Sequence, residues 1–476
     1  MLLLAANLVA LVVLVIPPRG RVRWLRYAAL APLPVLAVHL PAEGPRWQMI
    51  PAYVLGAAFA VGWLLRTLRP PGSRRWPRVL AAGLGALGLV VAAVPPLALP
   101  VFSFPEPSGP YDVGTLIYHW TDLARPEVFT ADPGDHRELM AQIWYPAKAD
   151  PTAPRAPYLE DAGAITPTLA RLLGVPEFAF GHLGLVRTNA VPSAPVADGE
   201  ARYPVLVLLG GVQGSRNVYT FKAEELASRG YVVAAIDMTY AYSTVVFPDG
   251  RRVAYDPRLG DRAFEDAHIP YLAGDVGFTL DRLAVLDRAD PNGVLTGRLD
   301  LARAGLTGQS LGAIVGSQAC LMEPRLRACL LEDGYMTSEA VRKGLRQPTM
   351  WITRDAEGMR LERRRAGGWA ESDIVEHQTT MRAVYASLPT EGYFVLVDGM
   401  FHLDMTDGPL MAAPPVAAAL GLSGPIGGSR AHDVINAYSV AFFDHELKGR
   451  DAPLLAGPSE RYPEVRIESR HPSSGR

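Results

Sequence analysis

The chain has 476 residues, of which 49% are hydrophobic, so it exceeds one ordinary domain and can bury a sizeable core. Its 46 basic and 48 acidic side chains leave a net charge of -2, which gives no electrostatic footprint for binding nucleic acid. The two cysteines, Cys320 and Cys329, are too few for a disulfide scaffold or a zinc site, and we expect both to pack in the core.

Four apolar stretches occupy the first hundred residues: 2–16, 24–40, 50–65 and 79–101. A transmembrane helix needs about 20 residues, and the first stretch is marginally short. A cleaved signal peptide would account only for that first stretch, whose start carries no basic side chain. The sequence predicts a membrane region over residues 1–104 with about four transmembrane helices. The alternative is three helices plus a re-entrant or signal segment.

Arginines gather after the first and third apolar stretches, whereas the loop after the second holds Glu43 and, at its edge, Arg46. Since positive charge marks cytoplasmic loops, this pattern predicts that everything after residue 101 lies on the outer side of the cell membrane. The arginines concerned are Arg19, Arg21, Arg23, Arg26, Arg66, Arg69, Arg74, Arg75 and Arg78.

From residue 109 onward, short apolar stretches alternate with stretches of helical spacing. The first strand, 139–145, suggests an antiparallel start, and alternation after it predicts a mostly parallel sheet with helices on both faces. We expect a catalytic domain over residues 105–452 and a flexible tail over 453–476. The expected strands are 139–145, 203–209, 231–236, 304–307, 326–331, 349–353 and 393–397, with helices at 221–228, 276–288 and 311–322.

The sequence Gly308-Gln309-Ser310-Leu311-Gly312 lies where a strand gives way to a helix. This is the pattern of the nucleophile elbow, in which glycines allow a sharp turn that lifts a serine hydroxyl clear of the sheet. The helix N-terminus behind the serine favours developing negative charge. The sequence therefore predicts an α/β-hydrolase fold with Ser310 as the nucleophile.

A serine nucleophile needs a histidine base, and His402 directly follows the last expected parallel strand through a glycine turn. Two carboxylates could orient that histidine, because Asp333 and Asp355 each end a strand at the same edge of the sheet. Spacing does not separate them. Asp398 and Asp404 are expected to shape the loop of His402.

Several motifs in order resemble the platelet-activating factor acetylhydrolase family, the serine-dependent, calcium-independent group VII phospholipases A2. The resemblance covers residues 109–449. The matching positions are Gly109-Pro110-Tyr111-Asp112-Val113-Gly114, Ile143-Trp144-Tyr145-Pro146, Arg216, Tyr219, the stretch 226–235, the elbow and His402.

The resemblance implies an esterase that acts on short or oxidised sn-2 acyl groups of phospholipids, with phospholipid and membrane lipid as partners. It favours Asp333 over Asp355 as the acid, and it places the oxyanion between the backbone N–H groups of Val212 and Leu311. It implies no cofactor. We expect no metal either, because no ligand spacing such as H-E-x-x-H occurs.

The chain departs from the family at Gly210-Gly211, at Gln309, at Ala313 and at Gly334-Tyr335, where histidine, histidine, glycine and tryptophan are usual. These changes leave the substrate open between phospholipids and small soluble esters, as for a general carboxylesterase or a dienelactone-hydrolase-like enzyme. A non-catalytic membrane sensor is the other alternative. Two apolar insertions, 169–191 and 409–428, are expected to form either a lipid-facing acyl pocket or an ordinary cap.

Overall fold

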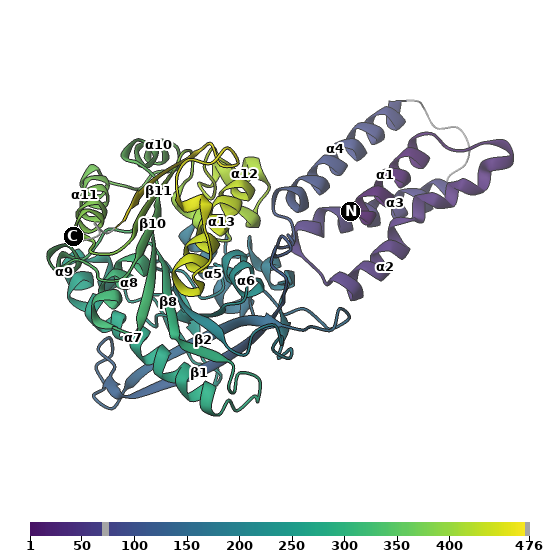
Figure 1. Cartoon of the computed structure of the whole chain (residues 1–476). Helices are drawn as coiled ribbons and strands as arrows, with labels where there is room; N and C mark the ends of the chain where they lie inside the picture. The colour runs from purple at the N-terminus through teal and green to yellow at the C-terminus, as the bar shows by residue number, and fades with distance from the viewer. Residues whose placement is uncertain (69–75, 472–476) are drawn as a thin grey trace.

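The computed structural model describes residues 1–68 and 76–471. A globular part carries a helical arm at one side, as Figure 1 shows. The globular part is built on one ten-stranded sheet with the order β12-β11-β10-β9-β8-β4-β5-β2-β1-β3. The strands are β1 (Asp112–Pro126), β2 (His136–Ala147), β3 (Val191–Pro192), β4 (Tyr203–Leu209), β5 (Val232–Asp237), β8 (Leu299–Gln309), β9 (Leu326–Glu332), β10 (Thr349–Thr353), β11 (Gly392–Val397) and β12 (Val465–Arg470).

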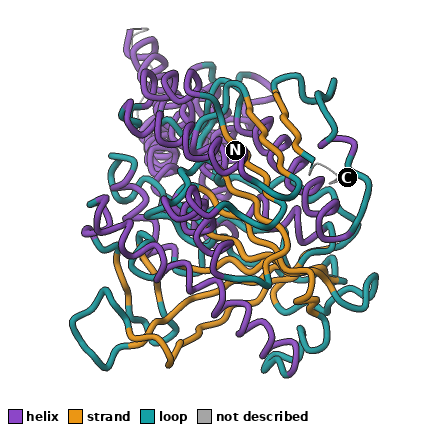
Figure 2. Tube along the Cα trace, turned by 60° about the vertical axis from the view of Figure 1, so that its left-hand side comes forward, coloured by secondary structure: helices purple, strands orange, loops and turns teal. Residues whose placement is uncertain are grey.

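The six central strands β5, β4 and β8 to β11 run parallel, and β1, β2 and β12 pair antiparallel at the two sides. The path of these strands through the middle of the molecule can be followed in Figure 2. Asp249-Gly250 lies in the turn of a separate hairpin, β6 (Thr244–Val246) and β7 (Arg252–Ala254). The predicted, mostly parallel α/β-hydrolase sheet is confirmed.

Two layers of helices cover the sheet and bury a separate apolar core on each face. On one face lie α7 (Arg262–Arg288), α8 (Leu311–Met322), α9 (Ser338–Lys343) and α11 (Glu371–Ser387); on the other lie α6 (Thr220–Ser228) and α13 (Gly428–Lys448). Because strands buried on both faces need apolar side chains throughout, β4 reads as the continuous run YPVLVLL. The remaining helices are α5 (Ala162–Leu172), α10 (Ala356–Ala366) and α12 (Pro414–Ala419).

The segment expected to be a flexible C-terminal tail instead completes the sheet. Residues Val465 to Arg470 form β12, which pairs antiparallel with β11 along its whole length. Its inward side chains are few, with Val465 buried and the others partly or fully exposed. A strand at the sheet edge needs apolar residues on one face only. The sequence of β12 is therefore mostly polar and did not predict a strand. The last part of the expected tail, 472–476, lies outside the described residues.

The arm consists of α1 (Leu2–Val15), the 3-10 helix η1 (Gly20–Leu30), α2 (Pro32–Glu43), η2 (Trp47–Met49), α3 (Ile50–Leu68) and α4 (Trp76–Ala98). Three stretches, Gly20–Glu43, Trp47–Leu68 and Val79–Ala98, are long and apolar enough to cross a membrane. These three candidate spans match the alternative of three helices plus a further segment, and α1 is the stretch that falls short. The 14 residues of α1 cover only about 21 Å at 1.5 Å per residue, short of a hydrocarbon core of roughly 30 Å.

The expected arginine loops are partly helical or lie outside the described residues. Arg21, Arg23 and Arg26 belong to η1 rather than to a loop. Arg69, Arg74 and Arg75 fall in the gap between residues 68 and 76. Three apolar helices of sufficient length still indicate that the protein associates with a membrane.

Cys320 and Cys329 are both buried, as expected, but they also form a disulfide that the sequence did not reveal. The bond joins α8, the helix behind the elbow, to the adjacent strand β9. A sequence with two cysteines nine positions apart does not indicate whether they form a disulfide or remain two free buried thiols.

Replacing both cysteines by alanine is expected to lower the free energy of unfolding by about 2–3 kcal/mol, because the disulfide closes a short loop in the unfolded chain. Chemical denaturation of the catalytic domain within the full chain, with and without reductant, measures this loss. A double variant as stable as the oxidised protein, or an unmodified protein that reacts with maleimide before denaturation, would contradict the assignment.

Candidate active site

Ser310 sits in a strained turn between β8 and α8. Its backbone angles are φ 57° and ψ -122°, a region that costs a residue with a side chain of order 1–3 kcal/mol. A Cβ on Gly308 would lie 2.2 Å from the carbonyl oxygen of Gly312, and one on Gly312 would lie 2.3 Å from that of Leu209. The two flanking glycines of the motif are therefore sterically required.

His402 reaches the same edge of the sheet from the loop after β11. Its Nδ1 lies 2.5 Å from Oδ2 of Asp333, the first residue after β9. Because a carboxylate accepts hydrogen bonds only, Nδ1–H donates and Nε2 is left as the unprotonated nitrogen. This tautomer is the one that can take a proton from a serine hydroxyl.

The carboxylate of Asp333 is fully buried and is held by three donors. Thr353 Oγ1 donates to Oδ1 at 2.7 Å and Arg354 donates to Oδ2 at 2.8 Å, in addition to His402. Burial alone would raise the pKa of Asp333, but the charge of Arg354 and the hydrogen bond from His402 outweigh it and hold that pKa well below its ordinary value. The carboxylate thus stays ionised opposite the imidazole.

Asp355, the alternative acid, lies elsewhere. Its side chain accepts a hydrogen bond from the N–H of Gly358 and forms an ion pair with Arg466 at 2.6 Å. Asp398 pairs with the same arginine. Asp404 does shape the histidine loop, since it accepts from the N–H groups of Phe401 and Gly424.

Ser310 and His402 line one cavity, although no hydrogen bond joins Oγ of Ser310 to His402 among the described residues. In hydrolases without substrate such a bond is often long and tightens only in the complex. The neighbouring Gln309 contacts the imidazole instead: its Nε2 lies 3.0 Å from Nε2 and 3.4 Å from Nδ1 of His402. With Nδ1–H donating to Asp333, the amide N–H of Gln309 donates to Nε2 of His402 in the absence of substrate.

Sequence reasoning missed the residues that support this pair. Gln309 is oriented by Tyr219, whose hydroxyl donates to its Oε1 at 2.9 Å and accepts from the N–H of Gly211 at 2.6 Å. The sequence did not predict a role for Arg354, because an arginine next to an aspartate in the sequence usually indicates an exposed ion pair. Only its complete burial against Asp333 and Glu362 reveals its part.

The two groups expected to hold the oxyanion lie at the start of α8 and in the loop after β4. The N–H of Leu311 opens helix α8, and Val212 follows β4 and lines the cavity. Neither N–H donates to an acceptor within residues 1–68 and 76–471. Free donors at a helix N-terminus suit a developing alkoxide.

The cavity has a volume of about 190 Å³ and largely apolar walls. Both apolar insertions contribute to it, the first through the end of α5 and the second through the loops around α12. Its apolar lining residues include Ile165, Leu169, Leu172, Leu173, Val218, Met411 and Leu422.

One group of side chains in the described chain has the composition of a metal site. The ligand atoms of Glu391, His445 and Glu446 lie within 4.8 Å of one another. None of the three lines the cavity of Ser310. The group therefore lies apart from the catalytic residues. Glu391 also accepts a hydrogen bond from Tyr393.

A serine on a strained turn, a histidine after the last parallel strand and a buried aspartate on one mostly parallel sheet define the α/β-hydrolase class. A family model described as "Platelet-activating factor acetylhydrolase, isoform II" matches residues 99–250. Over these residues the chain is similar to the platelet-activating factor acetylhydrolase family, and it is a carboxylic ester hydrolase.

Individual relatives agree with this assignment. The chain is 26% identical over 416 residues to a protein of Arthroderma benhamiae named "Probable 1-alkyl-2-acetylglycerophosphocholine esterase", covering 81% of this chain and 99% of that protein. It is 24% identical to a platelet-activating factor acetylhydrolase of Cavia porcellus, covering 72% and 78%. The solved structure of a ferulic acid esterase from Streptomyces cinnamoneus matches with a TM-score of 0.61 at 29% identity, covering 77% and 99%.

Asp333→Asn is expected to lower kcat by about 10,000-fold, because an amide cannot hold the imidazole in the required tautomer. Asp355→Asn should stay within about threefold of the parent, since it removes a half-exposed ion pair. Hydrolysis of p-nitrophenyl acetate measures both, with thermal melts to show that each variant is folded. Comparable losses in the two variants would contradict the geometry.

Proposed function

We propose that this protein is a membrane-anchored serine esterase that removes short or oxidised sn-2 acyl groups from phospholipids. The observation that carries the proposal is the position of the Ser310 cavity, whose apolar walls contact the end of the membrane arm. The names of the relatives, which refer to acetylated ether phospholipids, support the same substrate class.

In the proposed mechanism, Ser310 Oγ attacks the ester carbonyl while His402 Nε2 takes its proton. Asp333 holds the imidazole and stabilises its positive charge. The N–H groups of Val212 and Leu311 receive the oxyanion. The imidazolium then protonates the leaving alcohol, and water, activated by the same histidine, releases the acid from the acyl-serine.

The size of the cavity favours a short acyl group. Its volume of about 190 Å³ is below the roughly 300–1,000 Å³ of pockets that enclose drug-sized ligands. Leu169, Leu173 and Leu422 are among the apolar side chains that line it. An acetyl or a truncated chain fits such a space, and the remainder of a phospholipid would extend outward.

The cavity walls lie against the arm. Leu99, directly after α4, and Leu173 of the cavity wall both pack against the cluster around Leu422. The N–H of Ala413, at the start of α12, donates to the carbonyl of Ala98 at 2.9 Å. Figure 1 shows α12 on the side of the globular part next to the arm. A lipid leaving the bilayer would therefore meet the cavity at its nearest edge.

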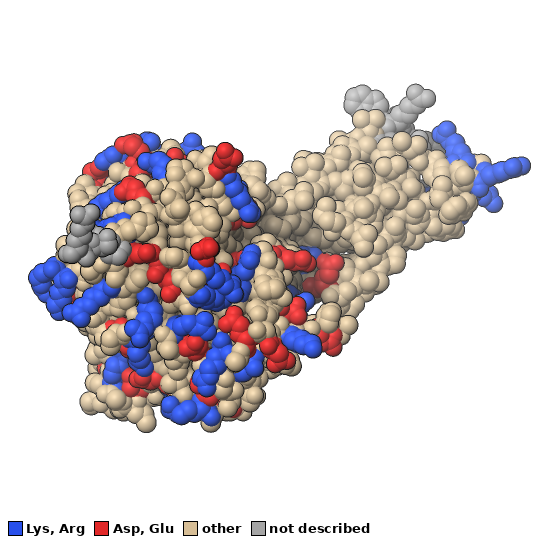
Figure 3. Space-filling view, in the orientation of Figure 1, with Lys and Arg blue, Asp and Glu red and all other residues tan. Residues whose placement is uncertain are grey.

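We also propose that the hydrolase domain faces the extracytoplasmic side. Figure 3 shows an arm almost without charged side chains except for basic ones at the end far from the globular part. Arg26 and Arg66 line a crevice at that end with Pro17. Cytoplasmic ends attract arginine, and a disulfide is typical of oxidising compartments, so the two observations favour the same orientation.

A second candidate function is a carboxylesterase on small soluble esters. The similarity to a ferulic acid esterase at 29% identity favours it. A non-catalytic sensor is not supported, because a sensor has no use for a buried Asp333 paired with His402 beside a strained serine.

Wild-type protein is expected to hydrolyse p-nitrophenyl acetate with a kcat/KM at least tenfold above that for the decanoate, and Ser310→Ala should abolish both. Leu169→Ala or Leu173→Ala should lower the ratio of kcat/KM for the acetate to that for the decanoate about tenfold. Each variant enlarges the cavity, and room for one methylene group changes kcat/KM by about tenfold or more. Leu123→Ala, an exposed leucine on β1, is the matched control. A wild-type preference for decanoate would contradict a short acyl pocket.

Orientation can be tested by labelling intact cells with a membrane-impermeant maleimide. In a Cys320→Ala/Cys329→Ala background, Leu123→Cys should react and Val22→Cys, at the arginine-rich end of the arm, should react only after lysis. Both side chains are exposed, so reactivity reports the side of the membrane. The reverse pattern would place the hydrolase domain in the cytoplasm.

A further inference from the structure

In the free enzyme, the amide of Gln309 occupies the nitrogen that the catalytic base uses. Nδ1–H of His402 donates to Asp333, so Nε2 is the ring nitrogen that accepts the proton of Ser310 during the reaction. The amide nitrogen of Gln309 lies 3.0 Å from this Nε2. Within the described chain, hydrogen bonds join the His402 ring to Asp333 and Gln309, and none joins it to Oγ of Ser310. The resting base is therefore engaged by Gln309 instead of by the nucleophile.

The orientation of this amide follows from the donors around it. The N–H of Gly211 can only donate, and it donates to the hydroxyl oxygen of Tyr219 at 2.6 Å. The hydroxyl proton of Tyr219 then goes to Oε1 of Gln309 at 2.9 Å. Because Oε1 faces Tyr219, the NH2 group faces His402 and can only donate to it. Gln309 and Tyr219 are 2% and 1% exposed, so the protein and not the solvent sets this arrangement.

The positions at which the chain departs from the family that it resembles meet at Tyr219. A Cβ on Gly210 would lie 2.6 Å from a ring carbon of Tyr219, and one on Gly211 would lie 2.8 Å from Oε1 of Gln309. A larger residue at either position would displace the ring or the amide. The glycine pair and Gln309 therefore act together, because the glycines make room for the hydrogen bonds that orient the amide.

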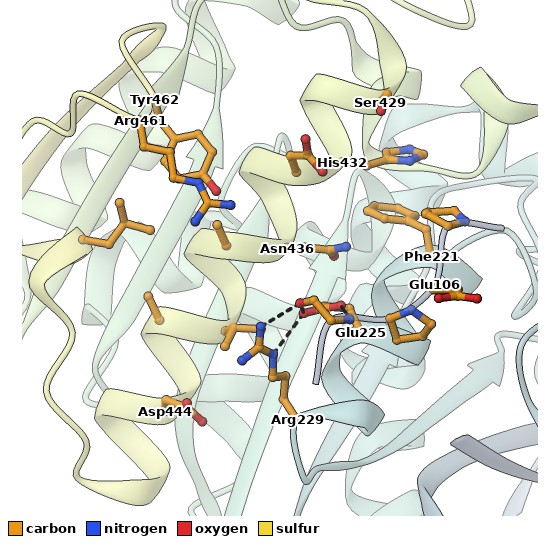
Figure 4. Close-up of a pocket in the computed structure, with 18 of the residues that line it drawn as sticks. Glu106, Phe221, Glu225, Arg229, Ser429, His432, Asn436, Asp444, Arg461 and Tyr462 are labelled. Atoms are coloured by element: carbon orange, nitrogen blue, oxygen red, sulfur yellow. Dashed lines mark hydrogen bonds and ion pairs between the residues drawn. The ribbon is translucent and has the colours of Figure 1, made fainter. Parts of the chain in front are cut away.

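Tyr219 is itself fixed in place, at the start of α6. Asp407 accepts hydrogen bonds from the first two backbone N–H groups of this helix, at 3.0 Å each. The ring of Phe221 stacks on that of His432 from α13, with 3.8 Å between the ring centroids, and Figure 4 shows the two side chains next to each other. Since Tyr219 is anchored in this way, a movement that frees His402 is confined to the side chain of Gln309.

We propose that Gln309 is a positioning residue that caps the catalytic base: its amide holds Nε2 of His402 until an ester enters the cavity and displaces it. Gln309 and Ser310 both line the cavity that receives the acyl group, so a bound ester meets the amide there. The NH2 group has a second acceptor nearby, since its nitrogen also lies 3.5 Å from the backbone carbonyl oxygen of His402. Release of Nε2 therefore leaves the amide with a hydrogen-bond partner and frees the lone pair for the proton of Ser310.

The cap has a defined kinetic consequence. A neutral hydrogen bond shifts an equilibrium by about two- to tenfold. Since a substrate breaks this contact when it binds, and the contact is absent from the complex, the cap raises KM and leaves kcat unchanged. This inference rests on the proposed function only for the roles of Ser310 and His402, and it holds for any ester that enters the cavity.

The test compares two substitutions of similar size in the full-length protein in detergent. Gln309→Met removes the donor, whereas Gln309→Glu replaces the NH2 group by a carboxylate oxygen that stabilises the protonated ring, which cannot accept the serine proton. Labelling of Ser310 by a fluorophosphonate, in which Oγ displaces fluoride and its proton passes to His402, is followed in time by mass spectrometry. We expect labelling to be about two- to tenfold faster in Gln309→Met and about tenfold or more slower in Gln309→Glu.

Hydrolysis of p-nitrophenyl acetate gives a second readout. Gln309→Met should lower KM about two- to tenfold with kcat within about twofold, a change that lost structural support would not produce. Gln309→Ala, which also lacks the donor, should change KM in the same direction and serves if Gln309→Met does not fold. Gln347→Met is the matched control and should leave labelling and hydrolysis unchanged, because the amide of Gln347 donates to the carbonyl of Cys320 at 2.9 Å, outside the cavity.

Thermal melts show for each variant that the protein is folded. Slower labelling in both Gln309→Met and Gln309→Glu, or equal labelling in Gln309→Met and the wild type, would overturn the cap while the proposed function stands. If Ser310 of the folded wild type is not labelled at all, the proposed function fails and the cap fails with it.

Discussion

The geometry of the active site depends on close packing of the elbow turn at Ser310 against the neighbouring backbone segments. Ser310 holds its strained backbone because Gly308 and Gly312 allow the chain segments to meet closely. The N–H of Ser310 donates to the carbonyl of Glu332 at 2.9 Å, which ties the elbow to the end of β9. Gly334 lies so close to the carbonyl of Ser310 that a Cβ there would approach it to 2.6 Å. Asp333 lies between Glu332 and Gly334 in the sequence. The same close packing that strains the backbone of Ser310 therefore also positions Asp333.

Electrostatics complete what packing begins. A carboxylate as buried as that of Asp333 would normally take up a proton, and Arg354 prevents this from within the core. Arg354 lies over the ring of Trp369, whose plane meets His402 edge-on, so the cation and the imidazole share one support. The acid, the base and their partners form a network in which each member limits the movement of the next.

The sequence was sufficient where local physics decides the structure. Gly308 and Gly312 mark the elbow, and continuous apolar runs mark the parallel strands, because both requirements are met within a few residues. It was insufficient where partners come from distant segments. The contacts of Arg354 with Asp333, of the Gln309 amide with His402 and of Cys320 with Cys329 all depend on tertiary structure. The first apolar stretch does not qualify as a span because its helix, α1, has only 14 residues.

If Ser310 is an acylating nucleophile that acts on a short ester at the membrane edge, a covalent probe should find it and a phospholipid should protect it. The decisive experiment is mass spectrometry of the full-length protein after reaction with a fluorophosphonate, with and without a 1-alkyl-2-acetylglycerophosphocholine as competitor. We predict a single adduct on Ser310 that the phospholipid suppresses. An adduct on another residue, or an unlabelled Ser310 in folded protein, would contradict this assignment.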